Sequence, residues 1–258
     1  MLDLIIKNAN ILDGTGAEAF WGDVGIKDGK ISAIGKLCDD AKEEIDAKGL
    51  TLSPGFIDSH SHSDSTLISQ PNQKEKLEQG ITFSITGQCG SSAAPKLTAD
   101  GLLTVKNFFD SIGDNRIGSG AAMLVGHNAL RKAVMGSENR APTREEMEKM
   151  KSLLREGMAA GAIGLSFGLI YVPGAYATTE EVLELAEVAA ECGGILASHI
   201  RGEGDLLLEA VDEFLGIIKH TGARAVFSHH KAAGKKNWGK VKTSLAMIDK
   251  ANEEGCNI

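Results

Sequence analysis

The sequence predicts an α/β fold of the (β/α)8 TIM-type barrel class, of which about six βα units are present, preceded by a small β part. Short apolar segments alternate with amphipathic helical segments from residue 55 onward. No glycine-rich phosphate loop follows the first apolar segment, as an open doubly wound sheet would usually have. Histidines stand instead at the carboxyl ends of several segments, where such barrels place their active sites.

Residues 1–54 are expected to form a separate, small antiparallel β unit. Two apolar stretches flank Asp28-Gly29 in DVGIKDGKISAIG, and glycine tolerates the positive φ of a tight hairpin turn. Pro54-Gly55 closes the last extended stretch. The second domain, residues 55–258, is expected to begin there.

Six segments of residues 55–258 have the short, apolar composition of strands that are covered on both faces. They are 55–60, 81–86, 121–126, 162–168, 194–199 and 224–229. Amphipathic helices between them include 143–158, 178–192 and 205–220. Because strand–helix–strand crossovers are right-handed, the six strands should form one parallel sheet. A closed barrel needs two more units, so we expect the chain to be truncated at its C-terminus.

The composition excludes several classes of protein. The 258 residues carry a formal charge of −8, and we find no basic face of the kind that binds nucleic acid. No apolar run approaches the roughly 18 residues that span a bilayer, and the N-terminus does not read as a signal peptide. The four cysteines form no CxxC pair, so disulfides are not expected. We therefore expect a cytoplasmic protein that binds neither nucleic acid nor membrane.

Two histidines separated by one residue follow the first predicted strand, in GFIDSHSHSD (55–64). Alternate residues of a strand point to the same face, so His60 and His62 should both point into the barrel mouth. Two imidazoles placed in this way can ligate one metal ion. A pair of hydrogen-bonded loop histidines is the alternative, and we favour the metal.

Three further metal-type residues follow later strands. Cys89 lies between two glycines in TGQCGSS, whose backbone permits a tight turn toward the barrel mouth. His199 ends the fifth strand in LASHIRGEGD, and His229 ends the sixth in VFSHHKAAG. With His60 and His62 they give five candidate ligands, one more than tetrahedral zinc takes. The excess suggests a second, weaker or partly occupied metal position.

Two cations are expected beside the metal. If strand geometry persists, Lys231 shares a face with His229, and Arg201 shares one with His199. Positive charge there suits a substrate that carries a carboxylate, although for Arg201 an ordinary solvated side chain is an equally good interpretation. His127 ends the third strand and could reach the same cleft, as a catalytic, hydrogen-bonding or structural group.

Five stretches of the sequence carry a family resemblance: GFIDSHSHSD, TGQCG, GLSFGLIYVPGAYA, SHIRGEGD and SHHKAAGKKNWG. Together they resemble the D-aminoacylases (N-acyl-D-amino-acid deacylases) of the amidohydrolase superfamily, from the first residue to the last. The resemblance implies a zinc-dependent hydrolase that cleaves the amide bond of small N-acyl-D-amino acids and releases a carboxylic acid and a D-amino acid. It also implies a (β/α)8 barrel beside a small β-sandwich, to which residues 2–54 would contribute the N-terminal part.

The resemblance implies roles for the five candidate ligands. Cys89, His199 and His229 match the residues that hold the tight zinc ion of the family. His60 and His62 match a second, weaker metal site, and the cysteine lies between the two sites.

The resemblance also implies a substrate pocket. Lys231 matches the lysine that contacts the substrate carboxylate, and Tyr171 and Tyr176 lie in the tyrosine-bearing loop after the fourth strand. The catalytic aspartate of the family ends the eighth strand, beyond residue 258, and Asp58 and Asp64 are poor substitutes for it. We therefore expect these 258 residues alone to bind zinc poorly and to lack deacylase activity.

Two alternatives differ in kind from a deacylase. A cyclic amidase, such as a dihydroorotase or hydantoinase, uses a carboxylated lysine at the end of the fourth strand, and GAIGLSFGLIYV contains no lysine. The other alternative is a non-catalytic, truncated metal-binding fragment. Neither the oligomeric state nor the preference for neutral or acidic substrate side chains follows from the sequence.

Overall fold

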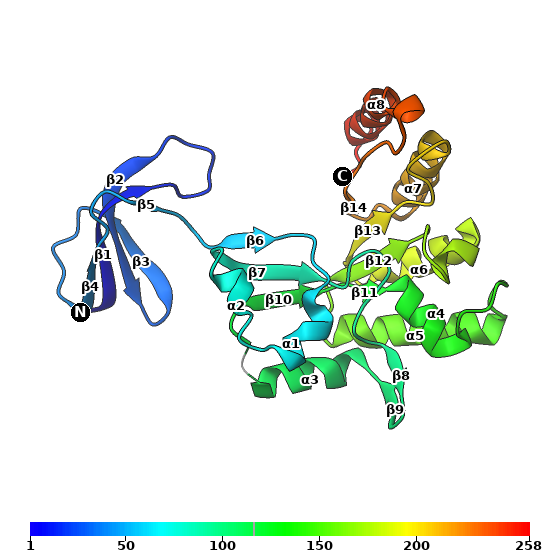
Figure 1. The fold of residues 1–258 in the computed structure, drawn as a ribbon, viewed down its shortest axis with the longest axis horizontal. Helices are drawn as coiled ribbons and strands as arrows, with labels where there is room; N and C mark the ends of the chain where they lie inside the picture. The colour runs from blue at the N-terminus through cyan, green and yellow to red at the C-terminus, as the bar shows by residue number, and fades with distance from the viewer. Residues whose placement is uncertain (116) are drawn as a thin grey trace. The chain divides into compact units, whose positions relative to one another are not determined.

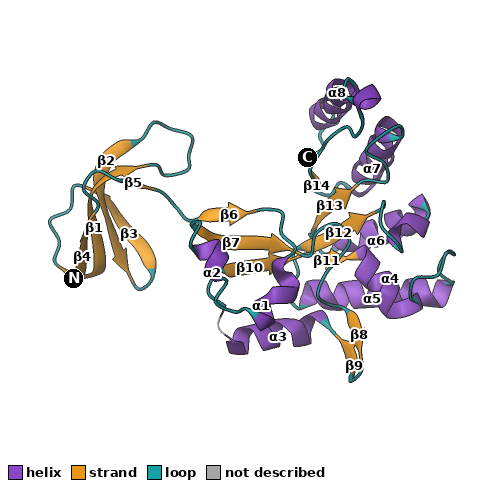
Figure 2. Ribbon diagram, in the orientation of Figure 1, coloured by secondary structure: helices purple, strands orange, loops and turns teal. Residues whose placement is uncertain are grey.

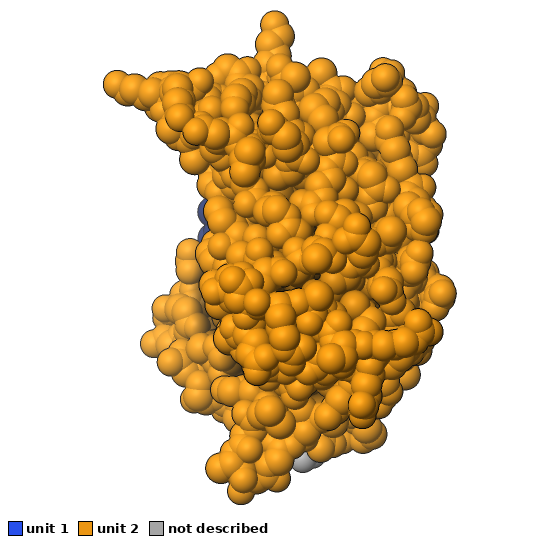
Figure 3. Space-filling view, turned by 90° about the vertical axis from the view of Figure 1, so that its right-hand side faces the viewer, with its two compact units in different colours: residues 1–56 blue, residues 57–258 orange. Residues whose placement is uncertain are grey.

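The chain forms two compact units in a computed structural model that describes residues 1–115 and 117–258. The first unit is Met1–Phe56 and the second is Ile57–Ile258, and Figure 3 distinguishes them by colour. Each unit has its own cluster of buried apolar side chains. Within the described residues, no helix has both the length and the apolar character needed to cross a membrane.

The first unit is one mixed β-sheet with the strand order β3-β2-β1-β4, and β5 also pairs with β1. Its strands are β1 (Leu2–Ile11), β2 (Phe20–Lys27), β3 (Lys30–Gly35), β4 (Ala41–Asp46) and β5 (Thr51–Leu52). The β2–β3 hairpin turns at Asp28 and Gly29 with positive φ angles of 51° and 71°, as predicted. The prediction of a purely antiparallel unit was wrong. Strands β4 and β5 both pair with the edge of β1 that β2 leaves free, and both run parallel to β1.

The second unit contains all six predicted strands, ordered in space as in the chain (Figure 1). They are β6 (Phe56–Asp58), β7 (Ile81–Thr86), β10 (Gly120–Met123) with β11 (Val125–Gly126), β12 (Gly164–Gly168), β13 (Ile195–His199) and β14 (Ala225–Phe227). The pairs β7–β10, β11–β12, β12–β13 and β13–β14 are parallel, but the strands form two sheets, β6-β7-β10 and β11-β12-β13-β14, and not the one sheet expected. The predicted strand 121–126 divides at Leu124, whose N–H donates to the Thr86 carbonyl at 3.0 Å. This arrangement is the expected part of a (β/α)8 barrel.

Helices follow the strands, as Figure 2 shows. They are α1 (Thr66–Ser69), α2 (Lys74–Leu77), α3 (Val105–Asn115), α4 (His127–Met135), α5 (Arg144–Ala159), α6 (Thr179–Glu191), α7 (Leu207–Thr221) and α8 (Lys240–Glu253), and a short hairpin consists of β8 (Lys96–Thr98) and β9 (Gly101–Leu103). Helix α5 begins with a capping box, in which the Glu146 N–H donates to the Thr143 hydroxyl and the Thr143 N–H donates to the Glu146 carboxylate. Thr178 caps α6 in the same way, but the Glu181 carboxylate turns instead to α4.

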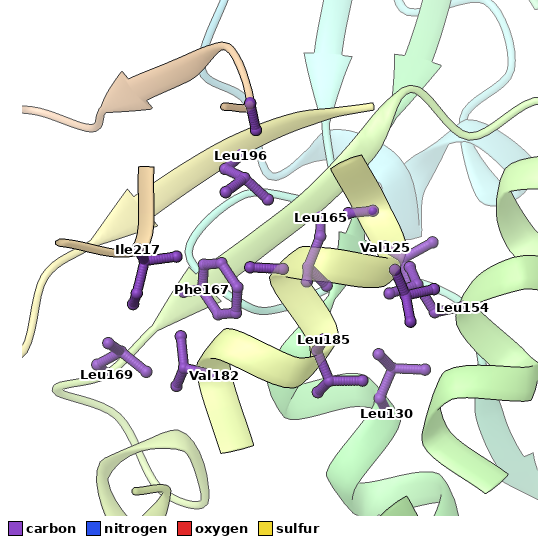
Figure 4. Packing of buried hydrophobic residues seen from close by; sticks show 14 of the residues in the cluster. Val125, Leu130, Leu154, Leu165, Phe167, Leu169, Val182, Leu185, Leu196 and Ile217 are labelled. Atoms are coloured by element: carbon purple, nitrogen blue, oxygen red, sulfur yellow. The ribbon is translucent and has the colours of Figure 1, made fainter. Parts of the chain in front are cut away.

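The core of the second unit lies between the parallel strands and their helices (Figure 4). All five residues of β12 are buried, and Leu165 and Phe167 pack toward Val182 and Leu185 of α6. Leu130 of α4 belongs to the same cluster. Full burial of these large side chains, at about 1.5–3 kcal/mol each, fixes the strands whose carboxyl ends carry the candidate site.

Candidate metal centre

The two histidines of the H-x-H motif lie in the loop after β6. The strand ends at Asp58, so strand parity does not extend to His62, contrary to the prediction. The rings of His60 and His62 are nevertheless neighbours, with centroids 5.4 Å apart in an edge-to-face arrangement. A loop, and not a strand, therefore places the rings of His60 and His62 side by side.

The acidic flanks of this motif hold its backbone. Asp58 Oδ1 accepts the His60 N–H at 3.3 Å, and Asp58 Oδ2 accepts a hydrogen bond from the mostly buried Lys76 ammonium at 2.8 Å. Burial raises the pKa of the Asp58 carboxyl, but Lys76 outweighs this effect and the pKa falls below its usual value. Asp64 is buried and accepts the Ala93 N–H at 2.5 Å. Both acids thus have anchoring partners.

Cys89 occupies a strained turn after β7. Its φ of 53° lies in the left-handed region, which is uncommon for a residue other than glycine. Gly87, at φ 71°, passes so close to the next strand that an added Cβ would lie 2.0 Å from the Leu124 carbonyl oxygen. Burial raises the pKa of the Cys89 thiol to about 11, and the nearby Glu203 carboxylate adds to the rise. The turn places a buried sulfur where it meets two histidines.

Cys89, His60 and His229 form the first candidate metal group. The Cys89 Sγ lies 3.4 Å from His60 Nε2 and 3.4 Å from His229 Nε2. The ligand atoms of all three residues lie within 4.8 Å of one another. His229, just beyond β14, also has a left-handed backbone, with φ of 38°. Two strained residues therefore converge on one point, as functional sites often require.

His199 belongs to a second, overlapping group. Its ring lies at the end of β13, 4.3 Å from the His229 ring between centroids, and it is grouped with His229 and Glu203 within 4.8 Å. Both ring nitrogens of His199 are buried without a hydrogen-bond partner among the described residues. Burial lowers the pKa of this imidazole to about 4, so the ring is neutral at pH 7. His229 thus belongs to both groups and connects Cys89 with His199.

These residues fit a zinc ion. Thiolate sulfur and neutral imidazole nitrogen are the ligands that zinc prefers, and the Nδ1 of His199 is buried without a hydrogen-bond partner among the described residues. Because zinc binds the thiolate, it would displace the proton that the buried Cys89 thiol carries at neutral pH.

The predicted substrate-binding residues fall into two groups. The Lys231 ammonium lies 3.2 Å from His229 Nδ1, and the Tyr171 ring stands 4.7 Å from the His199 ring between centroids. By contrast, the Arg201 guanidinium is bound to the Glu213 carboxylate on α7, with Nε and Nη2 each 3.0 Å from an oxygen. Tyr176 lies in a short 3-10 turn (Gly174–Tyr176) and lines none of the cavities near the cluster among the described residues.

Two cavities adjoin the cluster. The smaller, of about 190 Å³, is lined by residues that include His62, Cys89, Tyr171 and Lys132. The larger, of about 470 Å³, shares His62 and Lys132 with it. A small molecule in the smaller cavity would touch both Cys89 and Tyr171.

His127 has the hydrogen-bonding, structural role that the sequence left open beside a place in the cleft. His127 begins α4, is completely buried, and its Nε2 lies 2.8 Å from Glu181 Oε1 on α6. Glu181 also binds the buried Arg131 at 2.5 Å. His127 therefore belongs to a buried structural network and does not line the cavities at the cluster.

Glu203 is a site residue that sequence reasoning missed. Its Oε1 lies 3.2 Å from both His199 Nε2 and His229 Nδ1, and it accepts a hydrogen bond from Lys231. The signal was an acidic residue four positions after a strand-end histidine, within SHIRGEGD.

Comparison with known proteins assigns the family. Residues 43–251 match the amidohydrolase family, which is most of the chain. The chain belongs to the amidohydrolase family. Residues 1–53 match the N-terminal domain of the urease alpha-subunit.

Several relatives of this amidohydrolase are D-amino-acid deacylases. A D-aminoacylase from Alcaligenes xylosoxydans xylosoxydans is 38% identical over 264 residues, which cover 96% of this chain and 54% of that protein. A crystal structure of an N-acyl-D-glutamate deacylase from Bordetella bronchiseptica, complexed with zinc and a phosphonate inhibitor that mimics the tetrahedral intermediate, gives a TM-score of 0.94 at 40% identity. That match covers 99% of this chain and 57% of the other.

A D-aminoacylase structure concerned with the role of its binuclear metal centre gives a TM-score of 0.95 at 34% identity, over 100% of this chain and 57% of that one. The amidohydrolase chain thus spans a little over half the length of the relatives it matches. The predicted family resemblance and the barrel fold are confirmed.

Proposed function

We propose that the full-length protein is a zinc-dependent N-acyl-D-amino-acid deacylase. The observation that carries the proposal is the convergence of Cys89 with His60 and His229, beside the Lys231 ammonium. This places a metal-type cluster next to a cation that can bind a carboxylate. The zinc-bound N-acyl-D-glutamate deacylase, 40% identical, supports the same reading.

We assign the tight metal position to Cys89, His199 and His229, and a weaker second position to His60 and His62. The 3.4 Å approach of Cys89 to His229 and the buried Nδ1 of His199, which has no hydrogen-bond partner among the described residues, support the first assignment. The second draws support from the edge-to-face contact of the His60 and His62 rings. His60 also lies 3.4 Å from the Cys89 sulfur, so the cysteine adjoins both positions.

A zinc ion bound there would polarise the acyl carbonyl and lower the pKa of water. The chain itself would bind and orient the substrate. The Lys231 ammonium would hold the carboxylate of the amino acid, and the Tyr171 ring would form a wall of the cavity beside Cys89. Of the two loop tyrosines we favour Tyr171 over Tyr176 as the substrate contact, because only Tyr171 lines this cavity. Arg201 remains a predicted contact, for which it would have to exchange its pairing with Glu213 for one with substrate.

We assign the general base to none of the residues that the structure describes. The two acids nearest the H-x-H motif already have partners, since Asp58 pairs with Lys76 and Asp64 accepts the Ala93 N–H. Cyclic amidase activity is the less favoured reading, because β12 (Gly164–Gly168) contributes no lysine to bridge two metals.

The test is a hydrolysis assay on the full-length, zinc-loaded protein with matched N-acetyl-D- and N-acetyl-L-amino acids, dihydroorotate and hydantoin. We expect release of the free D-amino acid, loss of this activity on chelation, and its return with zinc. Preferential opening of a cyclic amide would favour the cyclic amidase. Hydrolysis of none of these substrates would reject the proposed function.

A further inference from the structure

Glu203 connects the metal histidines to the lysine. Its side chain is only 12% exposed, and the single oxygen Oε1 lies 3.2 Å from His199 Nε2, 3.2 Å from His229 Nδ1 and within hydrogen-bond reach of Lys231. The Glu203 carbonyl also accepts the Ala233 N–H at 2.6 Å, which ties the loop after β13 to the loop after β14. One carboxylate oxygen therefore contacts two imidazole rings and one ammonium group.

Glu203 faces the ring nitrogen of His229 that the Cys89 sulfur does not face. His229 presents Nε2 to the Cys89 sulfur and Nδ1 to Glu203. His199 presents Nε2 to Glu203, and its Nδ1 is buried without a hydrogen-bond partner among the described residues. Because the two nitrogens of one imidazole diverge, an ion bound by Cys89 and His229 would lie across the ring from Glu203.

Lys231 competes for the same nitrogen of His229. Its ammonium lies 3.2 Å from His229 Nδ1, and an ammonium can only donate hydrogen bonds. Pairing with Lys231 alone would make Nδ1 the acceptor and put the ring proton on Nε2, which faces Cys89. A carboxylate only accepts, so Glu203 requires the proton on Nδ1 and leaves the Nε2 lone pair for a metal ion.

We propose that Glu203 is a positioning residue that selects the metal-binding tautomer of His229 against the Lys231 ammonium. Carboxylates that hold metal-binding histidines in this way fix the ring and strengthen it as a ligand. The selection of the tautomer requires only that the site binds a metal ion. A second role of Glu203, to hold Lys231 where it can bind the substrate carboxylate, rests on the proposed deacylase function.

The test compares Zn²⁺ affinities, measured by competition with a chromophoric chelator, in the full-length protein carrying E203A, K231M or both changes. We expect E203A to bind Zn²⁺ about 10–100-fold more weakly. K231M should bind like the wild type, and the double variant should recover most of the loss because the competing donor is gone. A double variant as weak as E203A, or an E203A protein with wild-type affinity, would overturn the proposal.

Two more variants keep the test decisive if E203A does not fold. E203Q retains an oxygen acceptor without the charge and should lie between the wild type and E203A. E213A removes the acid that pairs with Arg201 and should leave Zn²⁺ affinity unchanged; an equal loss in E213A would mean a general structural effect and contradict the proposal.

A spectroscopic measurement separates positioning from direct ligation. With Co²⁺ in place of zinc, the Cys89 thiolate band should keep its energy in E203Q. A shifted band would identify Glu203 as a ligand and contradict the proposal. If the affinities follow expectation but no acyl-amino acid is hydrolysed, only the deacylase function is rejected.

Discussion

The sulfur of Cys89 lies 3.4 Å from Nε2 of His229, although the two residues are 140 positions apart in the chain. Cys89 follows β7 and His229 follows β14, and both have a positive φ. This contact is not local in sequence, so the cluster exists only when the parallel strands have brought the two loops together. The strain of two left-handed residues, at about 1–3 kcal/mol each, is therefore offset by the packing of the sheet and its helices.

Replacing this sulfur should abolish metal binding. We expect Cys89→Ser to lose bound zinc, because a serine hydroxyl stays protonated at neutral pH and is a poor zinc ligand. Cys192→Ser is the matched control, since Cys192 is an exposed free cysteine just past α6. Metal content after dialysis, measured by atomic emission, distinguishes the two. Equal zinc in both variants would exclude Cys89 as a ligand.

The sequence predicted the strands that carry the site because its signals there are local. The structure places β13 and β14 within the apolar runs that end at His199 and His229; β13 is largely buried, whereas Val226 of β14 is 48% exposed. The capping box of Thr143 and Glu146 is local in the same sense, since its partners are three residues apart. The resemblance supplied the grouping of ligands, which strand parity alone left open.

Other features of the site were not predictable from local patterns. Parity fails for His62, because β6 ends at Asp58 and loop geometry decides where the ring points. The sequence left open whether His127 is a cleft residue or a structural one; α4 begins at that residue and turns its ring to Glu181, 54 residues away. Glu203 was missed because its role depends on tertiary contacts with rings from two strands.

The turn that holds Cys89 should depend on the absence of a side chain at Gly87. An alanine Cβ there would lie 2.0 Å from the Leu124 carbonyl oxygen, so the backbone would have to move. We expect Gly87→Ala to reduce both zinc affinity and thermal stability. Gly222→Ala is the control, because Gly222 has a left-handed backbone (φ 65°, ψ 12°) but open space around it, and should cost only about 1–2 kcal/mol. Chemical denaturation and zinc titration test both; equal losses would contradict the steric explanation.

The buried Glu181 carboxylate should make the fold sensitive to acid. Burial raises its pKa, but hydrogen bonds from His127 and Arg131 outweigh this effect and lower the pKa below the usual value. A lowered folded-state pKa stabilises the fold above the unfolded pKa, about 4.3 for glutamate, and this stability is lost as pH falls through the folded value.

We expect Glu181→Gln to lower the free energy of unfolding at pH 7 by about 3–5 kcal/mol, because Arg131 would stay buried without its partner. The difference from the wild type should shrink as pH falls below about 4. Urea denaturation from pH 7 to pH 3 measures it, with the exposed Glu145→Gln as the control. A difference that is constant over this range would show that the charge of Glu181 does not matter.

The two tyrosines of the loop after β12 should differ in their effect on substrate. Tyr171 stands against the His199 ring and lines the cavity with Cys89, whereas Tyr176 lines neither cavity at the cluster. If the Tyr171 hydroxyl donates to the substrate carboxylate, Tyr171→Phe should raise KM about 10–100-fold, the loss expected for one hydrogen bond to a charged group. Tyr176→Phe should leave KM unchanged. Steady-state kinetics of the zinc-loaded, full-length protein on an N-acetyl-D-amino acid would decide, and a larger effect at Tyr176 would reverse the assignment.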